Sequence, residues 1–207
     1  SFPNFCDLNV RNWGKILKKK VDRRIQKSRK SLHLALMNLM KSTPYDEITV
    51  QMILDGANAG RTTFYDHFRN KDHLLVFGLE ELERDLRKAS EAERSLVGFS
   101  SHFFAHARDH KGVYRSLVKG SGWAIVRPFF QDMFSSLIKD RLTGARLGTD
   151  VPEDLLKHFL ASTMTELVVW WMEKNSSLSH DEINEMYLTL VMPVIKEGNV
   201  KPRGSRT

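Results

Sequence analysis

Residues 49–68, TVQMILDGANAGRTTFYDHF, constrain the fold of this chain more than any other stretch. Val50, Ile53 and Leu54 fall at i, i+3 and i+4, the spacing of one apolar face of a helix. Thr49 precedes them and can accept a backbone N–H bond as the N-cap. The first half of the stretch therefore predicts a short amphipathic helix.

The second half of the stretch predicts a tight turn and another helix. Asn58 tolerates the left-handed backbone conformation that a sharp turn needs, and Gly60 frees the start of the following helix. Only Phe64 and Phe68, at i and i+4, are suited to face inward. The remaining side chains are long or hydrogen-bonding, and they are Arg61, Thr62, Thr63, Tyr65 and His67. A helix of this composition faces a polar partner.

Two short helices joined by such a turn form a helix-turn-helix motif, whose second helix lies in the DNA major groove. The sequence ITVQMILDGANAGRTTFYDHFRNKDHLL resembles the signature of TetR/AcrR-type regulators: Thr-Val, two residues, Ile, Ala-Gly-Val-Ser, a Thr-(Leu/Phe)-Tyr-x-(His/Tyr)-Phe core and a Lys-(Asp/Glu)-x-Leu-Leu close. Asn58 stands where glycine is common, and Gly60 where a capping serine is common. The resemblance covers residues 24–75. It implies an all-α protein with an N-terminal three-helix DNA-binding domain and a C-terminal helical ligand-binding and dimerisation domain.

The resemblance also implies which residues contact DNA. Arg61 and Thr63 are expected on base edges, and Tyr65, His67 and Lys71 on phosphates. The full set of expected DNA-binding residues is Arg24, Lys27, Thr49, Gln51, Arg61, Thr62, Thr63, Tyr65, His67 and Lys71. The expected function is a ligand-responsive repressor that binds an inverted-repeat operator in double-stranded DNA as a homodimer.

The excess positive charge of the chain lies beside this motif. Residues 1–71 hold 14 Lys and Arg against 6 Asp and Glu, whereas residues 72–207 hold 18 against 19. A basic N-terminal part is by itself equally well explained as a solvated face. Its coincidence with the helix-turn-helix pattern favours nucleic acid as the partner.

The chain divides into four parts. We expect residues 1–20 to be a disordered leader or extension, 21–70 the helix-turn-helix domain, 71–197 the ligand-binding and dimerisation domain, and 198–207 a disordered tail. No cleavable signal and no apolar run of membrane length occur, and the single Cys6 excludes an internal disulfide. We therefore expect a cytoplasmic protein with no membrane partner and no cofactor.

Helical periodicity runs through the whole chain, with no alternation typical of strands. The first helix ends before Pro44, Asn70 caps the connector helix, and Pro128 either kinks a body helix or marks a later start. Pro152 opens the next helix, and residues 179–182 form a capping box for the last one. The expected helices before Pro152, beyond the two of the motif, span 21–41, 71–93, 96–109, 113–119 and 123–142.

The C-terminal part is unusually aromatic. Each aromatic residue taken alone is better explained as core. TetR-type proteins, however, enclose a ligand cavity in this region, and flexible methionines with large rings suit an unknown small apolar or aromatic ligand. The expected pocket residues are Phe103, Tyr114, Trp123, Phe130, Met133, Met164 and Leu167.

The last two helices carry more apolar surface than one subunit can easily bury. By resemblance they pair with their copies in a second subunit as a four-helix bundle, which gives a two-fold dimer. The expected interface residues are Val168, Trp170, Trp171, Tyr187, Leu190, Val191 and Val194.

His102, His106 and His110 lie at i, i+4 and i+8 on one helical face, a spacing that can bind zinc. No glutamate sits within this spacing as a metalloprotease needs, and Gly112 indicates fraying near His110, so a partly solvated histidine face is favoured. No Ser/His/Asp or Cys/His arrangement predicts a nucleophile, and we expect no enzyme. Two alternatives stay open: a helical small-molecule-binding protein whose head no longer reads DNA, and a metal sensor that uses the histidine face.

Overall fold

The computed structural model describes residues 7–92, 96–142, 151–174 and 176–196. This part of the chain is helical throughout and contains no strand, as predicted. None of the helices described is both long and apolar enough to span a membrane. Residues 198–207, expected to be a disordered tail, lie outside the described residues.

The N-terminal part, which we call the head, consists of α1 (Asp7–Met40), the 3₁₀ helix η1 (Tyr45–Glu47), α2 (Val50–Ala57) and α3 (Arg61–Tyr65). The Thr49 hydroxyl accepts a bond from the Met52 N–H at 3.2 Å, which confirms the predicted N-cap. Asn58 has φ 47°, the left-handed conformation predicted for the turn. The helix-turn-helix is therefore set by local sequence signals.

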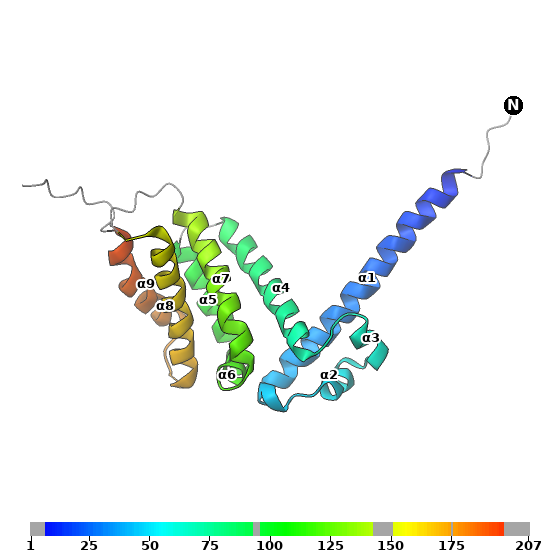
Figure 1. Ribbon diagram of the computed structural model, residues 1–207, viewed down its shortest axis with the longest axis horizontal. Coiled ribbons are helices and arrows are strands. Elements are labelled where there is room, and N and C mark those ends of the chain that lie inside the picture. The colour runs from blue at the N-terminus through cyan, green and yellow to red at the C-terminus, as the bar shows by residue number, and fades with distance from the viewer. Residues whose placement is uncertain (1–6, 93–95, 143–150, 175, 197–207) are drawn as a thin grey trace, which may run out of the picture.

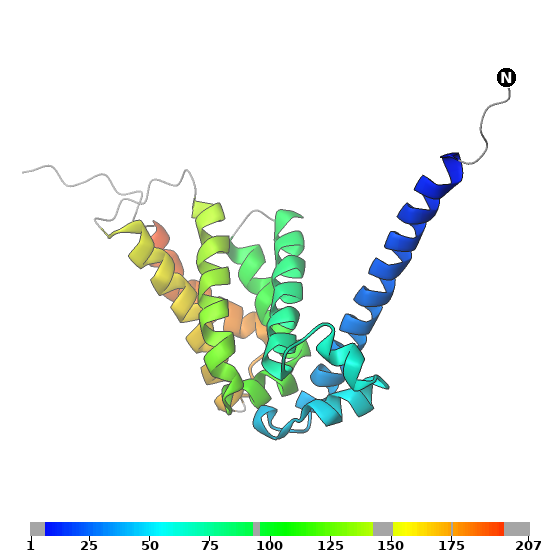
Figure 2. The ribbon, with the colours of Figure 1, turned by 45° about the vertical axis from the view of Figure 1, so that its right-hand side comes forward.

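The first helix begins at Asp7 rather than near residue 21, so the expectation of a disordered leader is wrong for residues 7–20. These residues contain no proline and four lysines, so the helix can extend backwards from the packed part of α1 although Gly14 lies within it. In Figures 1 and 2 the N-terminal half of α1 projects away from the rest of the molecule.

The C-terminal part, which we call the body, begins with the helix that comes directly after the head. It contains α4 (Lys71–Ala92), α5 (Leu96–Asp109), α6 (Lys111–Val118), α7 (Gly122–Leu142), α8 (Glu153–Glu173) and α9 (His180–Lys196). Within it α7 packs on α8 and α5 packs on α9, while α4 contacts α1 on one side and α5 and α7 on the other (Figure 1). The connector helix α4 therefore lies between α1 of the head and the other helices of the body.

The predicted helix boundaries in the body agree with the structure to within two residues. Pro128 lies inside α7, so it does not mark a later start. At the start of α9 the Glu182 N–H donates to the Ser179 hydroxyl at 3.2 Å, and Glu182 accepts from the Ser179 N–H at 2.7 Å. The predicted capping box is confirmed.

The centre of the body is a cluster of aromatic rings. Phe103 packs edge-on against Phe134 with ring centroids 4.6 Å apart and against Phe130 at 5.6 Å. Phe99 and Phe104, which are also fully buried, extend the cluster. Edge-to-face pairs of this kind add to the stability that ring burial itself supplies. The body thus has an interior of closely packed aromatic rings.

The head also touches the body through a second contact, which the loop after α1 and η1 make with α6 and the turn after it. The Ser116 hydroxyl donates to the Thr43 carbonyl at 3.0 Å, and the Ser121 N–H donates to the Asp46 carboxylate at 3.1 Å. Hydrogen bonds from Ser121 lower the pKa of Asp46. The two parts of the chain are therefore joined by side-chain contacts as well as by α4.

Candidate nucleic-acid interface

The second helix of the motif, α3, turns its polar side chains outward. Phe64 is fully buried, while Arg61 and Thr62 are exposed and Tyr65 is 55% exposed. Because α3 begins at Gly60 without a side-chain cap, its first N–H groups are also available to an anionic partner. The helix thus presents donors to solvent on the face opposite its anchor, as the sequence predicts.

The sequence pattern predicted a helix that includes Phe68, but α3 ends at Tyr65. The N–H groups of His67 and Phe68 both donate to the Phe64 carbonyl, at 3.0 and 2.8 Å. This tight turn brings Phe68 back into the core, and it leaves His67 half-buried after the helix. Thr63 is also half-buried, so the outward face of α3 itself consists of Arg61, Thr62 and Tyr65.

Further predicted DNA-binding residues surround this face. Arg24 and Lys27 are exposed on α1, and Thr49 is exposed at the start of α2. Gln51 is exposed as well, with its side-chain amide donating to Asp55 at 2.9 Å. These groups supply positive charge and hydrogen-bonding groups on α1 and at the start of α2.

Lys71 does not fit its predicted role at a phosphate. Its ammonium group donates to the carbonyls of Tyr45 at 2.8 Å and Ile48 at 3.0 Å, with a longer contact to Asp46 at 3.4 Å. The charge also lies 4.5 Å from the centre of the Tyr45 ring. Three N–H donors with three carbonyl acceptors make Lys71 an internal tie between η1 and α4.

The second helix of the motif, α3, is anchored by a group of aromatic rings against which one arginine packs. Phe68 contacts Phe64 and Phe77, with ring centroids 5.9 and 5.6 Å apart. The Arg29 guanidinium lies 4.2 Å from the centre of the Phe77 ring and 5.6 Å from that of Phe68. We did not predict this role for Arg29. Its spacing from Ile25 and Leu32, on one stripe of α1, is the signal that could have identified it.

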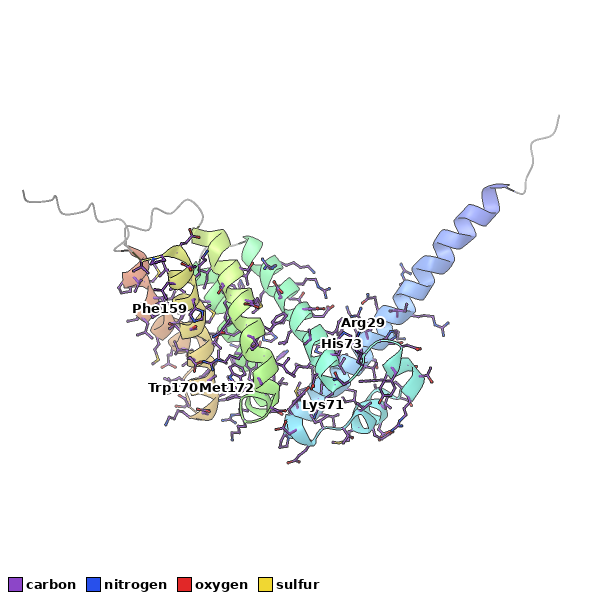
Figure 3. All side chains as sticks on the ribbon, in the orientation of Figure 1. Arg29, Lys71, His73, Phe159, Trp170 and Met172 are labelled. Carbon is purple, nitrogen blue, oxygen red and sulfur yellow. The ribbon has the colours of Figure 1, made fainter. Side chains whose placement is uncertain are left out.

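At the other end of the molecule, apolar side chains gather on the outer surface of α8 and α9. We call this set the α8–α9 patch, and its exposed members are Leu155, Phe159, Trp170, Met186 and Leu190. Phe159 and Trp170 lie on α8, far from Arg29 of the head and from Lys71 at the start of α4 (Figure 3). A shallow groove between the two helices is lined by Leu167, Trp170 and Leu190. An exposed apolar surface of this kind is typical of protein–protein contact sites.

The structure corrects four of the seven predicted dimer residues. Val168, Trp171, Tyr187 and Val191 are buried in the subunit's own core and are at most 1% exposed. Trp170 and Leu190 are exposed as predicted, and Val194 is half-buried. Because α8 is apolar on more than one side, periodicity alone could not tell its inner face from its outer face. Phe159 and Met186 are exposed patch residues that the prediction missed.

The predicted ligand pocket is also displaced. Phe103, Met133 and Met164 are packed in the core, Trp123 packs edge-on against Phe130, and Leu167 lies in the α8–α9 groove. A cavity of about 190 Å³ lies instead between α1 and the body, and we call it the junction cavity. It is lined by His33, Met37, Leu75, Gly78, Leu79, Glu81, Leu82, Asp85, His106, His110, Val113, Tyr114, Leu117 and Phe130. Of the predicted pocket residues, Tyr114 and Phe130 line it.

The predicted histidine face is divided by the fold. His102 is exposed, whereas His106 lies against the junction cavity with its Nδ1 3.2 Å from the Tyr114 hydroxyl and its ring centre 4.3 Å from that of His110. Over the residues that the structure describes, no three His, Cys, Asp or Glu side chains come together as metal ligands. The geometry therefore gives no support to a metal sensor.

Burial makes the stability of the body sensitive to mild acid. Burial and the neighbouring His110 lower the pKa of His106 to about 4, although Asp109 acts in the opposite direction. The unfolded chain, with an ordinary histidine pKa near 6.5, binds a proton more readily, so stability is complete above pH ~6.5 and falls as the pH drops toward ~4. We expect His106→Gln to flatten the pH dependence of the free energy of unfolding over this window, by as much as about 3 kcal/mol. Urea unfolding at several pH values tests this, and parallel curves for both proteins would contradict it.

These features define a class: a helix-turn-helix protein whose polar second helix is carried by an all-helical body with an exposed apolar patch. A model of bacterial regulatory proteins of the tetR family matches residues 34–76, and a model of a transcriptional regulator C-terminal region matches residues 97–193. The chain belongs to the TetR family.

Individual relatives agree with this assignment. The TetR transcriptional regulator from Streptococcus agalactiae 2603V is 28% identical and has a TM-score of 0.66, with 84% of this chain and 98% of that chain covered. The dihydroxyacetone kinase operon activator DhaS shares the fold at 17% identity and a TM-score of 0.65, covering 82% of this chain and 96% of that one. The uncharacterized HTH-type transcriptional regulator YxbF of Bacillus subtilis (strain 168) is 38% identical over 58 residues, which span 28% of this chain and only 15% of that protein.

Proposed function

We propose that this protein is a transcriptional regulator that binds an inverted-repeat operator in double-stranded DNA as a homodimer and releases it when a small ligand binds. The observation that carries the proposal is α3, which buries Phe64 and exposes Arg61, Thr62 and Tyr65. A short helix whose donors point away from its own core fits the major groove. Such a regulator acts by binding alone, in the cytoplasm where chromosomal DNA is found.

The α8–α9 patch supports the homodimer. One subunit leaves Trp170 43% and Leu190 55% exposed, and a second copy can cover both in a two-fold contact. Two heads held by one dimer would read two half-sites about 34 Å or more apart, which predicts an inverted repeat. The junction cavity supports ligand control, because its wall includes residues of both head and body.

Repression is the proposed direction of control. A dimer bound across a promoter excludes polymerase without any further contact, whereas activation needs an additional favourable surface. Activation is the alternative, because DhaS, which has a similar fold, is described as an operon activator. A reporter gene under the selected operator, with and without this protein, distinguishes the two directions of control.

The DNA-reading role is tested by substitution after the operator has been selected from genomic fragments. We expect Arg61→Ala to weaken operator binding by roughly 1–3 kcal/mol while leaving binding to a scrambled duplex almost unchanged. Arg24→Ala should weaken binding to both duplexes alike, because a phosphate contact carries no sequence information. It should also reduce the slope of log affinity against log salt concentration by about one.

Titrations of both duplexes at several salt concentrations provide the measurement. Equal affinity of the wild type for operator and scrambled DNA would favour the second candidate, a helical small-molecule-binding protein whose head no longer reads DNA. Unchanged affinities in both variants of a protein that does bind its operator would show that α3 and α1 are not the contacting elements.

A further inference from the structure

The chemistry of the junction cavity restricts what it can bind. Its wall is mostly aliphatic and aromatic, so the body of a ligand must be apolar. A volume of about 190 Å³ equals that of roughly six water molecules at about 30 Å³ each in the liquid. The cavity therefore suits a small aromatic or aliphatic compound.

The formal charges on the described wall are all negative. Glu81 and Asp85 of α4 line the cavity, and no described lysine or arginine lines it. Glu81, whose side chain is 24% exposed, pairs with Arg84, and Asp85, which is 77% exposed at the rim of the cavity, lies 3.9 Å from Lys88. Exposed pairs of this kind are weak, so the two carboxylates remain available to a ligand.

The polar groups on the opposite wall are neutral and can accept hydrogen bonds. Burial lowers the pKa of His33, His106 and His110, so these three imidazoles are uncharged at neutral pH. A neutral imidazole has one nitrogen that accepts, and the Tyr114 hydroxyl also has lone pairs. A ligand with several N–H donors therefore finds acceptors on both walls, whereas an anion finds two carboxylates and no lysine or arginine on the described wall.

We propose that the junction cavity binds a small organic amine, with its ammonium group beside Glu81 and Asp85 and its apolar body against Leu79 and Phe130. The aromatic faces of Tyr114 and Phe130 stabilise a nearby cation further. An anionic compound of the same shape binds more weakly, because Glu81 and Asp85 both repel its charge. This inference rests on the proposed function only for its regulatory meaning, since amine binding itself requires no DNA.

The cavity also connects its ligand to the head. His33 of α1 packs directly over Gly78 of α4, where an added Cβ would come within 2.3 Å of the His33 Nε2. A ligand that displaces this ring changes the distance between α1 and α4, the two helices that position the head on the body. The effect of the amine therefore reaches the head without passing through the aromatic cluster of the body.

The test uses three probes of similar shape: phenethylamine, phenethyl alcohol and phenylacetate. Isothermal titration of the full chain at neutral pH is expected to show the amine binding tightest and phenylacetate weakest. Glu81→Gln should weaken amine binding about tenfold or more and leave the alcohol unaffected, because only the charged donor loses its partner. Asp85→Asn should act in the same direction, whereas Glu80→Gln, at an exposed position next to Glu81 and outside the cavity wall, is the matched control.

Equal or tighter binding of the alcohol or of phenylacetate would overturn the proposal, as would no binding of the amine. Equal amine affinity in Glu81→Gln and wild type would overturn it as well. Amine binding that depends on Glu81 in a protein that never binds DNA would support this inference while the proposed function fails. If phenethylamine binds in the cavity but leaves operator affinity unchanged, the contact of His33 with Gly78 does not transmit ligand binding to the head.

Discussion

Phe68→Ala is expected to unfold the head while the body remains folded and dimeric. Phe68 is 1% exposed and joins the rings of Phe64 and Phe77 with the Arg29 guanidinium. Its truncation removes a full ring from this group and leaves a cavity, at a cost of about 3–5 kcal/mol. That is a large share of the stability of a small helical unit. Operator affinity should fall below detection, since α3 loses the anchor that fixes its orientation.

Hydrogen exchange separates local from global unfolding in this variant. We expect the amides of α2 and α3 to lose protection, and those of α7 and α8 to keep it. Leu34→Ala is the control, because Leu34 is 60% exposed on α1 and its truncation creates no cavity. Loss of protection throughout the chain would show that head and body unfold together. Retained DNA affinity in Phe68→Ala would contradict the role assigned to this aromatic group.

The second large effect is expected at the α8–α9 patch. Trp170→Glu and Leu190→Glu each introduce a charge where the proposed partner subunit lies, and a buried charge without a partner is strongly unfavourable. Both variants should be monomeric at concentrations where the wild type is a dimer. Operator affinity should fall by roughly 10²–10⁴-fold, because each head then binds its half-site alone.

Sedimentation equilibrium and operator titrations measure these two effects independently. Val97→Glu serves as the control, since Val97 is 44% exposed on α5 and lies outside the patch. Val168→Glu is a different test, because Val168 is fully buried inside the subunit and its replacement should impair folding itself. Intact dimers in both patch variants would place the partner surface elsewhere on the body.

Features set by neighbouring residues could be predicted from the sequence. The Thr49 cap, the left-handed Asn58 and the Ser179–Glu182 capping box each depend on groups within four residues of one another. The inward direction of Phe64 follows from its place on the helix, and that of Phe68 from the turn after Tyr65, in which its N–H donates to the Phe64 carbonyl. These local signals determined the helical class, the position of the reading motif and its polar outward face.

Contacts between distant segments were decided only by the tertiary structure. Val168 and Trp170 are two residues apart on a helix that is apolar on more than one side, and only the packing of α7 and α9 against α8 decides that the first is core and the second is surface. Lys71 is a lysine beside a DNA-binding motif, yet its ammonium group finds three carbonyls of a segment more than 20 residues away. The junction cavity likewise exists because α1 and α4 meet at His33 and Gly78. Periodicity specifies which face of a helix is apolar, but which neighbour covers that face depends on how all the helices pack together.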